Sequence, residues 1–250
     1  MGRSEPRLTL AEHLEELRRR LAISLLAVLA GTAFSLAHIH RLIAWLRRPA
    51  GEQLLNFAYF SPAEPLGAYL KVGVLAGLVL AMPVVLAQAW GFVRGGLQPD
   101  ERRWGLFFIW SGSGLFAAGV AFAYAVLLPL SLRVLLGIGA GTLIPVLSID
   151  RYLAFVMALA FWCGAVFELP VLLFLLAKLG IVTPEWLRQQ RPYAVLVLVI
   201  IAAVVTPTTD AVSLLLMAGP MVLLYELSIW VVHLGMRPRP SRSGARSPRR

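Results

Sequence analysis

Six long apolar blocks dominate this 250-residue chain, and they constrain its fold class more than any other feature. They cover approximately residues 21–37, 66–93, 104–128, 152–179, 192–205 and 211–232. The chain is 59% hydrophobic and only 14% charged, against about 25% charged in soluble domains. Lipid admits only helices or closed barrels, because every backbone N–H and C=O must be paired within the protein. Since the blocks are continuous rather than alternating, they predict an all-α integral membrane protein, a bundle of six transmembrane helices.

The N-terminal segment and the fifth block differ from ordinary transmembrane helices. The fifth block, Pro192 to Val205, would be ~21 Å long at 1.5 Å per residue, short of a ~30 Å hydrocarbon core. Thr206 to Asp210 has the composition of a tight turn, so a short hairpin between the fifth and sixth helices is expected. Between Thr9 and Leu21, leucines recur at helical spacing, which predicts a cytoplasmic amphipathic N-terminal helix.

Basic residues are distributed unevenly between the two sides of a six-span arrangement. One side holds the N-terminal segment, residues 94–103, residues 178–191 and the tail, with five, three, three and six Lys or Arg, 17 of the 23. The other side holds six, so the bias places both termini in the cytoplasm. Topology therefore accounts for the net charge of +10, and no nucleic-acid partner is expected. We expect residues 1–233 to form the transmembrane domain and residues 234–250, rich in Arg, Pro and Ser, a disordered basic tail near anionic lipid.

Two glutamates lie within the predicted spans. Glu168 is in the middle of the fourth block, where a charged carboxylate costs about 2.5–3.5 kcal/mol on insertion scales. It is interpreted either as a functional group facing the interior or as a protonated, hydrogen-bonded residue that fixes helix packing. Glu226 lies toward the cytoplasmic end of the sixth block, where a structural role is favoured.

Acidic residues also occur among the cytoplasmic arginines. Glu15 and Glu16 precede the first span, and Glu101 precedes the third. The simplest interpretation is local pairing, Glu15 with Arg19 and Glu16 with Arg20, four residues apart on a helix. Carboxylates are also favourable near helix N-termini, where the macrodipole is positive.

The residues provide no support for an enzyme. Ser111 to Gly114 resembles the nucleophile segment of an intramembrane serine protease, but the four histidines all lie outside the spans or at their ends, so no base is expected beside it. The sequence contains no phosphate loop, dinucleotide fingerprint or metal cluster, so we expect no catalytic residues, cofactor or metal. A proton-coupled secondary transporter or channel using Glu168 remains an alternative, although no internal repeat is visible.

An ordered set of short motifs resembles the TatC family, the multi-spanning core subunit of the twin-arginine protein translocase. The motifs are HLEELR (13–18), SPAEP (61–65), QAWGF (88–92) with ERR (101–103), FELP (167–170), TP (206–207) with Asp210, and Pro220 with YE (225–226). Each motif is weak alone, but their order and depth along the chain make the resemblance specific.

The resemblance implies a function and a set of site residues. It implies a receptor that binds twin-arginine signal peptides and moves folded proteins across the inner (cytoplasmic) membrane, using the proton motive force. It implies single-span partners like TatA and TatB in a hetero-oligomer of several copies. The implied positions are Glu16, Arg18, Phe92 and Glu101 for the signal peptide, Glu168 as the intramembrane polar group, and Pro207, Asp210 and Glu226 as further motif positions.

Overall fold

The computed structural model describes residues 10–48, 58–96, 104–138, 147–205 and 211–235. In these ranges regular structure is helical, apart from one isolated parallel bridge between Ala58 and Ser148. The helices are α1 (Leu10–Ala37), α2 (Ile39–Arg47), α3 (Glu64–Val93), α4 (Gly105–Phe122), α5 (Leu128–Ile138), α6 (Ile149–Phe167), α7 (Leu169–Lys178), α8 (Pro184–Gln189), α9 (Arg191–Val205) and α10 (Ala211–Gly235). A 3-10 turn, Arg94–Gly96, follows α3, and a π-helical segment, η5 (Ala123–Leu127), joins α4 to α5.

The described helices confirm an all-α, multi-pass membrane protein. Five helical stretches are long and apolar enough to cross a bilayer: Glu12–Ala37, Glu64–Val93, Gly105–Gly137, Ile149–Lys178 and Met217–Leu234. The helix α9 is apolar but has only 15 residues, as the fifth block predicted. The third block was predicted too short, because the helix continues through η5 and α5 to Ile138.

The N-terminal region differs from the expected separate amphipathic helix. Residues 10–21 are the first turns of α1, which continues without a break to Ala37. Leu14 and Leu21 are each 66% exposed, so their apolar stripe does not pack on the rest of the chain. Nothing interrupts the helix at Leu21, because α1 contains no Pro or Gly before Gly31 and helical hydrogen bonding continues.

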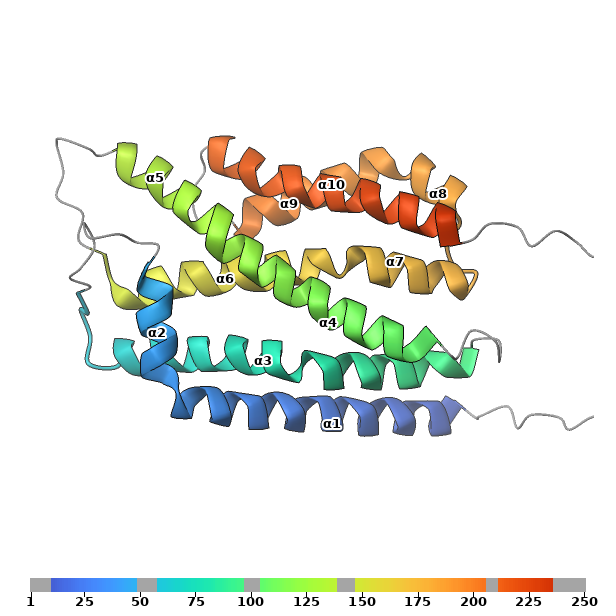
Figure 1. The fold of residues 1–250 in the computed structure, drawn as a ribbon, viewed down its shortest axis with the longest axis horizontal. Coiled ribbons are helices and arrows are strands. Elements are labelled where there is room, and N and C mark those ends of the chain that lie inside the picture. The colour runs from blue at the N-terminus through green and yellow to red at the C-terminus, as the bar shows by residue number, and fades with distance from the viewer. Residues whose placement is uncertain (1–9, 49–57, 97–103, 139–146, 206–210, 236–250) are drawn as a thin grey trace, which may run out of the picture.

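The spans lie side by side along the long dimension of the molecule, and α4 crosses its neighbours obliquely (Figure 1). At one end α1 begins, α3 ends, α4 begins and α10 ends, and α8 lies there as well. At the opposite end α2 lies across the ends of α1 and α3. We name these the α8 end and the α2 end.

Close contacts between helix backbones hold the bundle together. A side chain added at Gly31 of α1 would meet the carbonyl oxygen of Gly77 in α3 at 2.6 Å. A side chain added at Gly119 of α4 would meet the carbonyl oxygen of Cys163 in α6 at 2.6 Å. Small residues of this kind let membrane helices approach closely and gain van der Waals contact, which is the main attraction between helices in lipid.

Two tyrosines hold α2 in place at the α2 end. The last carbonyls of a helix have no partner within it. Here the Trp45 carbonyl, which also accepts from the backbone N–H of Arg48, accepts from the Tyr124 hydroxyl at 2.7 Å. The Leu46 carbonyl accepts from the Tyr152 hydroxyl at 2.9 Å. The apolar face of α2, formed by Ile39, Ile43 and Leu46, is buried against the bundle.

Candidate functional site

A polar pocket of about 550 Å³ opens at the α8 end between α1 and α3. We call it the acidic pocket. It is lined by Glu12, Glu15, Glu16, Arg19, Arg20, Ile23 and Gln88. Three carboxylates face two guanidinium groups, so the lining carries a formal excess of one negative charge. Its glutamates stand in the first two turns of α1, where the helix dipole favours anions.

One arginine connects the predicted residue Glu16 to α3. Arg20 donates to Oε1 of Glu16 from Nε at 3.0 Å and from a terminal nitrogen at 2.5 Å, and its other terminal nitrogen donates to the Gln88 carbonyl at 3.4 Å. Gly91 makes room for this guanidinium, which occupies the space that a side chain at position 91 would take. The expected pairing of Glu16 with Arg20 is therefore present, and it also joins two helices.

The predicted residue Phe92 lies beside the same helix. Its ring stacks on that of His13, with centroids 4.4 Å apart and planes inclined by 27°. His13 precedes Glu16 by three residues, so the Phe92 contact and the Glu16 contact fall on one side of α1. The exposed Arg18 is two residues from Glu16, about 200° around the helix, and it does not line the acidic pocket.

Three predicted positions, Glu101, Pro207 and Asp210, lie outside the described residues. The structure brings Glu16 and Phe92 to one region and adds three residues to which the sequence assigned no role there, His13, Glu12 and Gln88. Helical spacing from Glu16 could have indicated the first two. Gln88 is distant in the chain, and its part depends on how α1 packs on α3.

Glu168 lies at the break between α6 and α7. Pro170, in the first turn of α7, lacks an N–H group, so the helical hydrogen-bond pattern is interrupted beside Glu168. The Oε1 atom is buried and accepts no hydrogen bond from the described residues. Oε2 lies close to α4, since a side chain added at Gly112 would meet it at 3.0 Å. The carboxyl group therefore faces the interior, where glycine leaves space beside it.

Glu226 has a different environment, in an ion pair between helices. Its Oε2 accepts a hydrogen bond from Arg191 at 2.7 Å, which links α10 to the start of α9. The neighbouring Tyr225 hydroxyl donates to the Leu187 carbonyl of α8 at 2.8 Å. These contacts fix the α8–α9 segment on α10, in keeping with a structural role.

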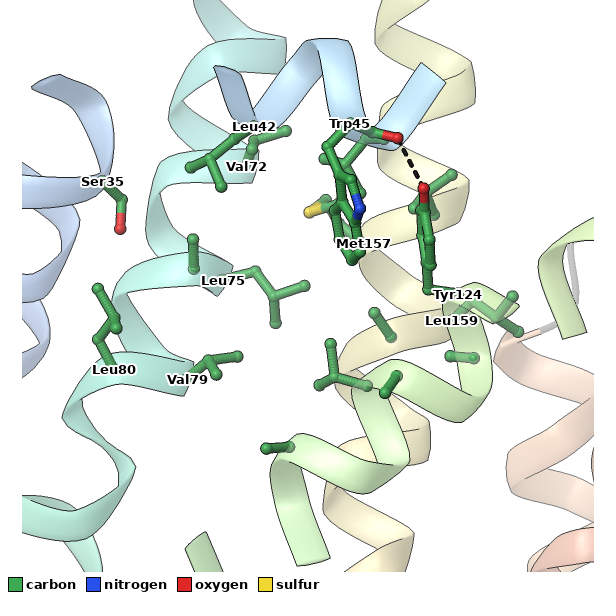
Figure 2. A pocket seen from close by; sticks show the side chains of 18 of the residues that line it. Ser35, Leu42, Trp45, Val72, Leu75, Val79, Leu80, Tyr124, Met157 and Leu159 are labelled. Atoms are coloured by element: carbon green, nitrogen blue, oxygen red, sulfur yellow. Dashed lines mark hydrogen bonds between the residues drawn. The ribbon is translucent and has the colours of Figure 1, made fainter. Parts of the chain in front are cut away.

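Two apolar hollows complete the membrane region. The α2-end cleft, of about 430 Å³, lies between α3 on one side and α4 and α6 on the other, below α2. Figure 2 shows the rings of Trp45 and Tyr124 beside it, stacked with centroids 3.8 Å apart. The α8-end groove, of about 550 Å³, lies between α4, α7 and α10. Among the described residues, no group of three or more His, Cys, Asp or Glu could hold a metal ion.

Comparison with known proteins bears directly on this arrangement. The family model described as "Sec-independent protein translocase protein (TatC)" matches residues 12–220. A TatC protein of Carboxydothermus hydrogenoformans is 37% identical over 224 residues, 90% of this chain and 92% of the relative. A chloroplastic TATC of Arabidopsis thaliana is 38% identical, over 91% of this chain and 67% of the relative.

A solved structure agrees with the fold as well. The crystal structure of the twin-arginine translocase receptor TatC superposes with a TM-score of 0.81 and 36% identity, covering 90% of this chain and 100% of that one. These matches favour a protein translocase over the alternative of a secondary transporter or channel. The chain therefore belongs to the TatC family of Sec-independent protein translocase proteins and is a core subunit of a twin-arginine translocation system.

Proposed function

We propose that this protein is the signal-peptide receptor of its translocation system and binds twin-arginine signals at the α8 end. The observation that carries the proposal is Glu16, which already holds a guanidinium, that of Arg20, in a pocket with one excess negative charge. Guanidinium and carboxylate groups form charge-assisted, often bidentate hydrogen bonds, which a lysine ammonium cannot reproduce. The pocket therefore suits arginine specifically.

The remaining predicted residues complete this binding model. Both hydrogen bonds from Arg20 to Glu16 use Oε1 of the carboxylate. An incoming arginine therefore binds Oε2 or displaces Arg20. Glu101, between α3 and α4 in the chain, binds the second arginine. Phe92 packs against the signal beside Glu16, Arg18 contacts its flanking residues, and the apolar stretch of the signal lies along the bundle.

The membrane arrangement forms part of the same proposal. The chain spans the inner (cytoplasmic) membrane six times with both termini in the cytoplasm, so the α8 end faces the cytoplasm. The apolar helix α9 is the fifth of the six crossings in chain order, and the bilayer thins beside it. Residues 1–233 are the transmembrane domain, and the basic tail, whose residues 236–250 lie outside the described residues, contacts anionic lipid.

Membership of a translocation system supports a proposal for the partners and the energy source. Single-span subunits like TatA and TatB dock on the outward face of α9, in a hetero-oligomer of several copies. Transport is driven by the proton motive force rather than by catalysis in this chain. Glu168 supplies a polar, water-filled concavity within the membrane. Pro207 and Asp210, outside the described residues, are further positions of the family motifs.

Peptide binding to the purified protein in detergent tests the receptor function. A fluorescent peptide with Arg-Arg should bind more tightly than its Lys-Lys counterpart. Glu16→Gln should weaken Arg-Arg binding by about 10- to 150-fold, because a hydrogen bond to a charged group contributes roughly 1.5–3 kcal/mol. We expect the same direction for Glu101→Gln.

The matched control is Glu185→Gln, which removes an exposed carboxylate at the same end of the molecule. This variant should bind as the unmodified protein does. Equal affinity for both peptides, unchanged by Glu16→Gln and Glu101→Gln, would reduce these acids to helix-end charges and refute the receptor site.

A further inference from the structure

The α8-end groove is an apolar hollow within the membrane. Its lining includes Phe107, Leu115, Val171, Phe174 and Val231. Ser111 also lines it, but its hydroxyl donates to the Phe108 carbonyl at 3.3 Å and so is directed at the backbone. Water in such a site would find few polar partners, and the volume is within the range of small-molecule pockets, so the expected occupant is a hydrocarbon chain.

The mouth of this groove is cationic and aromatic. Lys178 stands in the last turn of α7, with Nζ 5.5 Å from the centroid of the Phe174 ring. Trp104, 51% exposed, lines the groove where α4 begins. Lysine ammonium groups and tryptophan rings both favour the depth of lipid head groups. The groove therefore has a positive interfacial end and an apolar intramembrane end.

We propose that the α8-end groove binds one acidic phospholipid, with an acyl chain between α4, α7 and α10 and the phosphate at Lys178. Basic pockets between membrane helices on the cytoplasmic side are suited to acidic head groups. The apolar stretch of a twin-arginine signal is a poorer occupant, because the arginines that precede it would be repelled by the same ammonium group. The proposal concerns a site separate from the acidic pocket.

Native mass spectrometry of the full chain in a neutral detergent tests the proposal. Phosphatidylglycerol and phosphatidylcholine with identical acyl chains are added at equal concentration. The protein should retain one phosphatidylglycerol molecule with about a five-fold preference over phosphatidylcholine. This ratio corresponds to an attraction of ~1 kcal/mol between one lysine and an acidic head group. Lys178→Gln should abolish that preference, because the remaining apolar contacts do not distinguish the two lipids.

The other lysine of the chain is the matched control. Lys71 pairs with Asp150 at 2.6 Å at the α2 end, and Lys71→Gln should keep the five-fold preference. Leu115→Trp, or Val231→Phe if that variant does not fold, should fill the groove and reduce retention of both lipids. Binding of the Arg-Arg peptide should persist in each folded variant.

Three results would overturn the lipid site. The first is equal retention of the two lipids by the unmodified protein. The second is a phosphatidylglycerol preference that survives Lys178→Gln or is lost equally in Lys71→Gln. The third is displacement of the lipid by one equivalent of signal peptide, which would assign the groove to the peptide.

Discussion

Two glutamates of the spans show how a side chain's neighbours decide what it contributes. Glu226 is paired with Arg191, and both side chains are partly exposed, so the pair resembles an interfacial salt bridge. Glu168 has a buried Oε1 that accepts no hydrogen bond from the described residues, and Gly112 leaves space beside Oε2. A buried polar atom that costs stability and accepts no hydrogen bond from the described residues is expected to be retained for function.

Replacing each glutamate by leucine should therefore give different results. Glu168→Leu should raise the free energy of unfolding in detergent by about 2 kcal/mol, because an uncompensated polar group is removed from the interior. The same variant should lose protein export. Glu226→Leu should lower the free energy of unfolding by less than about 1 kcal/mol, as is typical of exposed ion pairs.

Thermal unfolding in one detergent and export of a folded reporter measure both effects. A destabilised Glu168→Leu variant would favour the alternative interpretation, in which Glu168 fixes the packing of α6 and α7. Export that remains normal in this variant would remove Glu168 from the mechanism.

At the scale of elements, α9 combines a buried and an exposed face on a helix too short for a typical bilayer. Leu198 and Ala202 are buried against the bundle at 6% and 0% exposure. Leu196, Ile200 and Val204, spaced by four residues, are 57%, 52% and 78% exposed. This exposed stripe is the surface on which we propose that single-span subunits dock.

Cysteine cross-linking tests this docking surface. Ile200→Cys should form disulfides with cysteines placed in the membrane helix of a TatA- or TatB-like partner, because its side chain points away from the bundle. Leu198→Cys should not, because its side chain is buried. The single native cysteine, Cys163, is 4% exposed and should contribute no background. Equal cross-linking at both positions, or at neither, would contradict docking on α9.

At the scale of the whole molecule, α1 begins and α10 ends at the α8 end (Figure 1). That end also holds the acidic pocket and the cationic mouth of the α8-end groove. The proposed site of signal recognition and the expected cytoplasmic excess of basic residues are therefore on the same side of the molecule.

Labelling with a membrane-impermeant maleimide tests this orientation in intact spheroplasts. Phe60→Cys, at an exposed position before α3 at the α2 end, should be labelled from outside. Ile181→Cys, exposed between α7 and α8, should react only after the membrane is permeabilised. Labelling in the reverse order would invert the proposed topology and place the acidic pocket on the wrong side for signal recognition.

Local sequence determined the spans and the simplest contact of the site. Lipid requires long apolar helices, so the second block, predicted as 66–93, is α3 at Glu64–Val93, and the short fifth block is α9. The Glu16–Arg20 pair was predictable because the two residues are one helical turn apart. The family motifs each occupy a few adjacent positions, so the sequence alone was also sufficient to predict the family and its function.

Contacts between distant residues were decided only by the tertiary structure. The sequence did not predict α2, whose last turn accepts hydrogen bonds from the hydroxyls of Tyr124 and Tyr152, 79 and 106 residues away from their acceptors. Arg20 reaches Gln88 over 68 residues because Gly31 and Gly77 let α1 and α3 cross closely. The acidic pocket and the two apolar hollows also depend on how helices that are distant in the sequence pack together. Apolar pattern specifies which residues enter lipid, but the geometry of helix crossing specifies which of them meet.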